Sequence, residues 1–155
     1  MIDLFLVSSI DECRRAAAAV AAPHRPGPAA GAGSVLLVHD PALIPEVEAP
    51  LTEDKDFGEF AARFDRTIDL GQLVWPLLPG QFSPRDSELH IWERVLRSHW
   101  DLGDAALRLR LPTVDSGPAD ALRRIFPDAA ICRVPPAPDA RAGTGPERDH
   151  GHAGG

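Results

Sequence analysis

The sequence predicts an α/β domain, a Rossmann-like three-layer sandwich around a mainly parallel sheet of about five strands. Short continuous apolar runs, typical of strands buried on both faces, alternate with segments whose apolar residues recur at helical spacing. The length of 155 residues, 44% of them hydrophobic, suits one domain with a core of ordinary size. We expect this domain to span residues 1–134. Residues 135–155 hold no Leu, Ile, Val or aromatic residue, which predicts a disordered tail rich in Pro, Gly and Ala.

The first two predicted strands are the apolar runs over residues 4–7 and 35–38. A helix follows the first of them, because Ser9 and Glu12 form an S-x-x-E capping box. In such a box the serine hydroxyl accepts a hydrogen bond from the backbone N–H of Glu12, and the glutamate carboxylate reaches back toward the start of the helix. Pro23 ends this helix.

The middle of the chain predicts a second helix and an edge strand. The helix begins at Thr52, and its apolar residues have the i, i+3, i+4, i+7 spacing of a buried stripe. The stripe consists of Phe57, Phe60, Ala61 and Phe64. The string RTIDL alternates polar and apolar residues, which predicts a third strand near an edge. Residues 71–82 are broken by two prolines, so we expect them to cross the surface irregularly while burying Trp75 and Phe82.

The second half of the chain predicts two helices and two strands. Ser83 as N-cap and Pro84 at the first helical position begin the clearest helix, which Gly103 ends. Its apolar side carries Leu89, Trp92, Leu96 and Trp100, with Ile91 and Val95 beside them. The string ALRLRL predicts the fourth strand and AAICRV the fifth. Between them, Gly117 and Pro118 open the last helix.

The candidate binding residues directly follow two of the predicted strands. Ligands of open parallel sheets bind beyond the carboxyl ends of the strands. Ser8 and Ser9 follow the first strand, where a serine hydroxyl and the free N–H groups of a helix N-terminus can hold an anion; alternatively, Ser9 only caps the helix. His39 and Asp40 follow the second strand and form a candidate acid/base pair, because an adjacent carboxylate raises the pKa of a histidine; the alternative is a polar strand exit.

Several kinds of chemistry lack their motif. The turn after the first strand, SSIDE, contains no glycine, which disfavours NAD-type and P-loop nucleotide sites. No G-x-S-x-G nucleophile motif occurs. His90 and His99 lie about two and a half helical turns apart and cannot hold one ion from the same face, and no other metal-ligand spacing occurs before residue 135. We therefore expect no catalytic residue of these classes, no metal and no cofactor.

Composition and charge limit the partners and the compartment. The 16 basic and 23 acidic residues give a formal charge of −7, which disfavours nucleic acid as a partner. No apolar run approaches the roughly 20 residues of a transmembrane helix, and Asp3 lies where an export signal needs positive charge. Cys13 and Cys132 are far apart in sequence, which favours reduced thiols. We expect a cytoplasmic protein.

Four strings, FDRTIDL, QFSP, ELHIWERVLRSHWDLGD and PADALRRIFPDA, resemble in this order the bacterial α-2,8-polysialyltransferase-like glycosyltransferase family. The likeness covers residues 1–131 and is strong from residue 64 to residue 129. The positions that match its motifs are Trp92, Glu93, Arg94, Trp100, Gly103, Asp104, Phe126, Pro127 and Asp128.

The resemblance implies a GT-B enzyme, in which two Rossmann-like domains face each other across a cleft. Such an enzyme moves sialic acid from a CMP-activated donor onto a glycan without a metal. The family's acidic-Gly motif, which supplies the base, and its His-Pro motif, which holds CMP, do not occur in this chain. We therefore expect the acceptor-side N-terminal half of such an enzyme, truncated and inactive alone. The alternative is a noncatalytic binding or interaction module that contacts a separate protein through the apolar segment 73–82.

Overall fold

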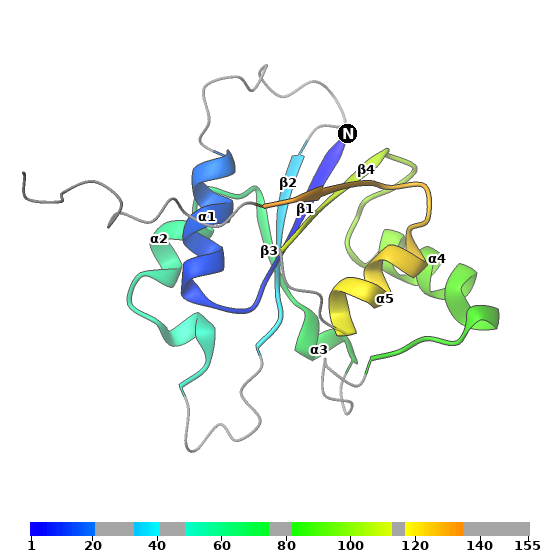
Figure 1. Ribbon diagram of the computed structural model, residues 1–155, viewed down its shortest axis with the longest axis horizontal. Coiled ribbons are helices and arrows are strands. Elements are labelled where there is room, and N and C mark those ends of the chain that lie inside the picture. The colour runs from blue at the N-terminus through cyan, green and yellow to red at the C-terminus, as the bar shows by residue number, and fades with distance from the viewer. Residues whose placement is uncertain (21–32, 41–48, 75–81, 113–116, 135–155) are drawn as a thin grey trace, which may run out of the picture.

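The computed structural model describes residues 1–20, 33–40, 49–74, 82–112 and 117–134, which form a sheet with helices on both faces (Figure 1). The sheet has five strands, all parallel, in the order β3-β2-β1-β4-β5. They are β1 (Ile2–Val7), β2 (Gly33–Val38), β3 (Arg66–Asp69), β4 (Leu107–Leu111) and β5 (Ala130–Arg133). This topology confirms the predicted Rossmann-like α/β sandwich and the predicted position of the third strand at an edge.

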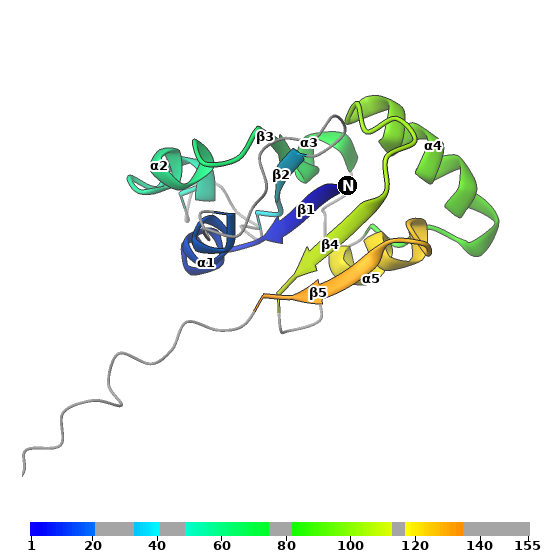
Figure 2. The same ribbon diagram turned by 90° about the horizontal axis from the view of Figure 1, so that it is seen from above.

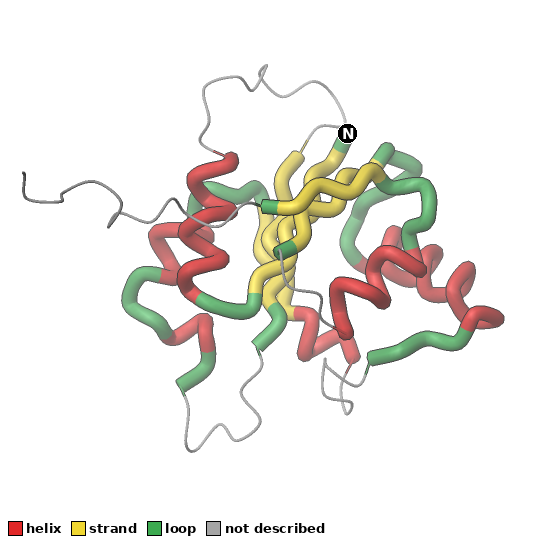
Figure 3. Tube along the Cα trace, in the orientation of Figure 1, coloured by secondary structure: helices red, strands yellow, loops and turns green. Residues whose placement is uncertain are grey.

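Helices cover the two faces of the sheet in two groups, which Figure 2 shows on opposite sides of the strands. One group contains α1 (Ile10–Val20) and α2 (Phe57–Ala61) with the 3-10 turn η1 (Leu51–Glu53). The other contains α4 (Leu89–His99), preceded by the 3-10 turn η3 (Asp86–Glu88), and α5 (Gly117–Ile125). The short helix α3 (Leu70–Val74) directly follows β3 (Figure 3). None of the helices within the described ranges combines the length and apolar character needed to cross a membrane.

The core is divided by the sheet into two apolar clusters. Alternate residues of β1 point to opposite faces, so Leu4 and Leu6 join the cluster under α4 and α5, and Phe5 joins the cluster under α1 and α2. Trp100, at the end of α4, is only 1% exposed and is among the largest side chains of the first cluster. Phe64 packs edge-on against Phe5 in the second, with ring centroids 5.3 Å apart. Both faces of β1 and β2 are buried, as the continuous apolar runs predicted.

The predicted helix beginning at Thr52 is wrong in its extent. Residues 51–53 form only a 3-10 turn, and regular helix starts at Phe57. Asp54 has an extended backbone (ψ 137°), and its carboxylate accepts from the N–H of Asp56 at 2.9 Å, so a local side-chain hydrogen bond replaces the helical one. Phe64 reaches the core from beyond the end of α2.

The clearest predicted helix is shorter at both ends than the sequence indicated. Ser83 does not cap it; the Glu88 carboxylate instead accepts from the Arg85 N–H at 3.1 Å, and α4 proper begins at Leu89. At the other end, Asp101 adopts the left-handed conformation (φ 52°) that ends a helix, two residues before Gly103. The turn closes with the Leu102 N–H donating to the Arg97 carbonyl at 2.8 Å.

The connection after β3 is helical at its start, where the sequence predicted an irregular path. The Asp69 carboxylate accepts from the N–H of Gly71 at 2.8 Å and so begins α3. Phe82 is buried as predicted and packs edge-on against Trp92 at 4.8 Å. The predictions for Trp75, for most of segment 73–82 and for the tail over 135–155 lie outside the described residues.

Candidate functional site

The strand register brings the four predicted binding residues to one edge of the sheet. Val7 of β1 pairs with Val38 of β2, so Ser8 and His39 leave neighbouring strands side by side. The His39 N–H donates to the Val7 carbonyl at 2.8 Å, which extends the pairing by one residue. Ser8, Ser9, His39 and Asp40 are all half-buried. The carboxyl edge of β1 and β2 is therefore a cluster of polar groups that ordered backbone holds in place and that a ligand can reach.

Glu12 forms hydrogen bonds with both serines of this cluster. Its carboxylate oxygen Oε2 accepts from the backbone N–H of Ser8 at 2.5 Å and from the Ser8 hydroxyl at 2.9 Å. The Ser9 hydroxyl accepts from the Glu12 N–H at 3.2 Å. The predicted capping box is thus confirmed, and the residue that the carboxylate reaches is Ser8. This arrangement places a negative charge at the N-terminus of α1, where a phosphate or other anion would otherwise bind.

His39 supplies a neutral imidazole to the same edge. Burial lowers the pKa of His39, and the charges of Asp40 and Glu12 oppose this shift without cancelling it. The folded protein therefore carries this side chain uncharged at neutral pH, with one ring nitrogen able to accept a hydrogen bond. Asp40 accepts from the Leu51 N–H at 2.8 Å and so fixes the turn η1 beside the cluster. An uncharged ring that can accept a proton is suited to hold a hydroxyl group.

The described residues form a small cavity at the place where Rossmann-like sheets usually bind ligands. The strand order reverses between β1 and β4, and a crevice outside their carboxyl ends is the expected nucleotide position. Side chains that include Glu12, Pro112 and Val134 reduce the cavity there to about 10 Å³. That volume is too small for any ligand larger than a water molecule. The polar cluster lies to one side of it, across β1 and β2.

The remaining ionisable groups contribute little to this site. Cys13 is fully buried, and burial is the main cause that raises its pKa to about 11, so the thiol stays protonated and is a poor nucleophile. Cys132 is half-buried on β5. Within the described ranges, no group of three or more His, Cys, Asp or Glu side chains could hold a metal ion.

Of the nine residues on which the resemblance rests, Arg94, Gly103, Asp104, Pro127 and Asp128 are exposed, and the other four make contacts within the fold. Trp100 and Phe126 lie in the core, and Trp92 packs against it. Glu93 forms an ion pair with Arg97 at 3.1 Å. Arg97 also donates to the carbonyls of Gly103 and Ala105, at 3.0 Å each, and so ties the end of α4 to the chain entering β4. Contacts of this kind, made across a turn, leave no periodic signal in the sequence.

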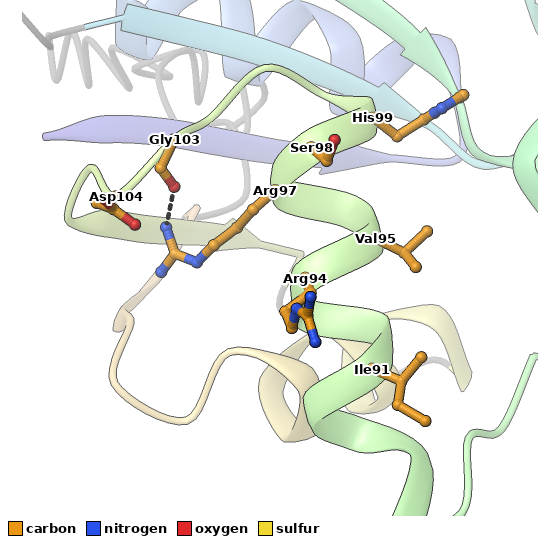
Figure 4. A pocket seen from close by; sticks show the side chains of 8 residues that line it. All are labelled: Ile91, Arg94, Val95, Arg97, Ser98, His99, Gly103 and Asp104. Atoms are coloured by element: carbon orange, nitrogen blue, oxygen red, sulfur yellow. Dashed lines mark hydrogen bonds between the residues drawn. The ribbon is translucent and has the colours of Figure 1, made fainter.

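A broad hollow of about 780 Å³ lies along the outer face of α4 (Figure 4). Ile91 and Val95, expected beside the apolar side of the helix, are 52% and 43% exposed. Figure 4 shows both side chains pointing away from the turn that holds Arg97 and Gly103. The exposed stripe is open and apolar, which is typical of a contact surface and unlike a catalytic pocket.

No protein-family model, no curated protein and no solved structure matches this chain. The geometry of the carboxyl edge therefore carries the functional inference.

Proposed function

We propose that this domain is the acceptor-side half of a GT-B glycosyltransferase related to the polysialyltransferases, and that its carboxyl edge binds the hydroxyl groups of an acceptor glycan. The position of the Glu12 carboxylate, bonded to Ser8 at the N-terminus of α1, carries this proposal. The resemblance of the sequence supplies the reaction class.

A nucleotide-activated donor brings phosphate, and Rossmann-like domains hold phosphate with the free N–H groups of a helix N-terminus. In this domain the Glu12 carboxylate already accepts a hydrogen bond from the Ser8 N–H, and the negative charge of this carboxylate repels a second anion. The cavity that the described residues form at the strand reversal holds only about 10 Å³. Both features support a donor site in a second domain and an acceptor-binding role for this one.

A sugar hydroxyl both donates and accepts hydrogen bonds, and the carboxyl edge offers both kinds of partner. The neutral ring of His39 accepts from a hydroxyl, and the oxygen of the Ser8 hydroxyl, whose O–H donates to Glu12, can still accept a hydrogen bond. This domain thus positions the acceptor. Transfer itself requires the donor and the groups that hold it, so the isolated domain binds glycan without turning over a sialyl donor.

A thermal-shift experiment on the full chain tests the proposal. The ligands are CMP, CMP-sialic acid, oligosialic acid and a neutral galactose-terminated oligosaccharide. We expect at least one glycan to stabilise the fold, by about 2.7 kcal/mol at a hundredfold excess over its Kd, and CMP to have no effect. His39→Gln should reduce the glycan shift, and His90→Gln, on the exposed side of α4, should not. Stabilisation by CMP alone would contradict the proposal.

A second candidate is a noncatalytic interaction module, and the exposed stripe on α4 favours it. Ile91 and Val95 are large apolar side chains on one helix face that no described element covers. An Ile91→Glu variant separates the two candidates. It should leave glycan binding unchanged if the carboxyl edge is the functional site, and it should abolish a protein complex if α4 is.

A further inference from the structure

A groove of about 570 Å³ runs beside the outer edge of β3, on the side away from β2. The four residues of β3 line it, together with Gln72 of α3 and with His99 and Trp100 at the end of α4. Its volume lies within the roughly 300–1,000 Å³ of small-molecule sites. The groove is distinct from the polar cluster at Ser8 and His39, and no pattern in the sequence predicted it.

The backbone of β3 offers hydrogen-bonding groups to this groove. The N–H of Asp65 donates to the Ser34 carbonyl at 3.0 Å, so the odd-numbered residues here direct their backbone groups toward β2. Successive residues of a strand alternate in this direction. The N–H and C=O groups of Arg66 and Ile68 therefore face outward, and no strand within the described ranges pairs with that edge.

The side chains of the groove add both donors and acceptors. Thr67 and Gln72 are exposed, and each can donate and accept. The Arg66 guanidinium donates to the Trp100 carbonyl, which anchors the floor of the groove to the end of α4. A set of this kind matches a ligand whose own groups both donate and accept, as sugar hydroxyls do. A phosphate mainly accepts hydrogen bonds, and its negative charge would be repelled by the Asp69 carboxylate.

The groove adjoins the polar cluster at the carboxyl edge. Val38 is in register with Asp69, so the ends of β2 and β3 are neighbours. His39 directly follows β2, and Asp69 is the last residue of β3. Asp69 itself lines the groove. A ligand held at His39 can therefore continue past Asp69 along the edge of β3.

Charge limits what kind of sugar chain can take this path. Glu12, Asp40 and Asp69 place three carboxylates at the carboxyl edge of β1, β2 and β3. The groove itself also contains the guanidinium of Arg66, but this group already donates to the Trp100 carbonyl, and the chain as a whole carries a formal charge of −7. A polymer with a carboxylate on every sugar would be repelled along this path, whereas uncharged sugars would not.

We propose that the groove beside β3 is an extended subsite for a neutral, polyhydroxylated saccharide chain whose terminal unit lies at His39. This inference rests on the proposed function, which it narrows by naming the substrate class: a neutral glycan in place of oligosialic acid. The terminal sugar contacts the cluster at Ser8 and His39. The sugars behind it contact Thr67, Gln72 and the outward backbone groups of β3.

Calorimetric titration of the full chain tests this subsite. The probes are lactose, a neutral tetrasaccharide and hexasaccharide of the same series, and oligosialic acids of two, four and six units. We expect affinity to rise with length in the neutral series and to be about tenfold weaker for oligosialic acid of equal length at low salt. Gln72→Ala and Thr67→Val should each weaken hexasaccharide binding about fivefold, the effect of one lost hydrogen bond, and leave lactose binding unchanged. His90→Ala, outside both sites, should change neither.

The outcomes separate the subsite from the function on which it rests. Neutral binding that is independent of length, or that the two groove variants leave unchanged, overturns the subsite and keeps the acceptor function. Tighter binding of oligosialic acid than of neutral chains overturns the substrate class alone. Absence of binding by every glycan overturns both the subsite and the proposed function.

Discussion

The carboxyl edge of the sheet and the helix α4 both gather polar side chains, but the two regions use them differently. On α4, Arg97 makes three polar contacts within the fold, with Glu93, Gly103 and Ala105. At the carboxyl edge, His39 keeps a neutral ring at a position that ligand can reach. The α4 region holds most of the strings on which the proposed resemblance rests, whereas the carboxyl edge has weak sequence signals and the groups suited to binding. The contacts of Arg97 and the burial of Trp100 show that the α4 region holds the fold together.

Truncation of Trp100 should have the largest effect and tests the structural role of α4. Trp100→Ala removes a side chain that is 1% exposed and packs in the larger core cluster, so it should lower the free energy of unfolding by about 3–5 kcal/mol. Urea denaturation followed by circular dichroism measures the change. A loss below about 1 kcal/mol would show that α4 is not integral to the core.

Replacement of Arg97 should cost less, because it removes polar contacts and leaves the core intact. Arg97→Ala loses the bonds to two carbonyls and the ion pair with Glu93, and the expected loss of stability is about 2 kcal/mol. Arg94→Ala, an exposed neighbour on the same helix, is the matched control and should stay within about 0.5 kcal/mol of the unmodified protein. Equal effects of the two variants would remove the distinction between a structural and a solvated arginine.

Neutralisation of Glu12 tests the role of the carboxyl edge and should have a smaller effect on stability. Glu12→Gln removes the negative charge from the start of α1, which should cost about 1 kcal/mol of stability. The same change should let the helix N-terminus accept an anion, so inorganic phosphate should stabilise the variant and not the unmodified protein. Asp11→Asn removes a first-turn charge without freeing the Ser8 N–H and serves as the control. Unchanged phosphate binding in Glu12→Gln would remove the main support for an acceptor-side domain.

The sequence predicted features that depend on burial and on strand order, and it missed those set by a choice between competing local caps or by distant contacts. Continuous apolar runs indicated β1 and β2, because both of their faces are buried. The meeting of Ser8 and His39 followed from parallel strands ending at one edge. The start of α4 was wrong because the Glu88 carboxylate, and not Ser83, makes the capping bond. The groove beside β3 depends on Arg66 reaching Trp100, 34 residues away, which no local pattern records.

The pH dependence of stability should show the smallest effect, and its sign follows from His39. Burial lowers the pKa of His39 in the folded protein below its ordinary value of 6.5, so the unfolded chain binds a proton more readily than the folded one. Stability should therefore be complete above pH 6.5 and should fall as the pH drops through that value toward the folded pKa. His39→Gln cannot take up this proton, so its stability relative to the unmodified protein should improve as the pH falls from 7.5 to 5.5. Denaturation midpoints across this range measure the difference, with His90→Gln as the control. A difference in stability that is constant with pH would mean that the ring of His39 is solvated like an ordinary surface histidine. The carboxyl edge would then lack the neutral ring proposed to accept a hydrogen bond from a sugar hydroxyl.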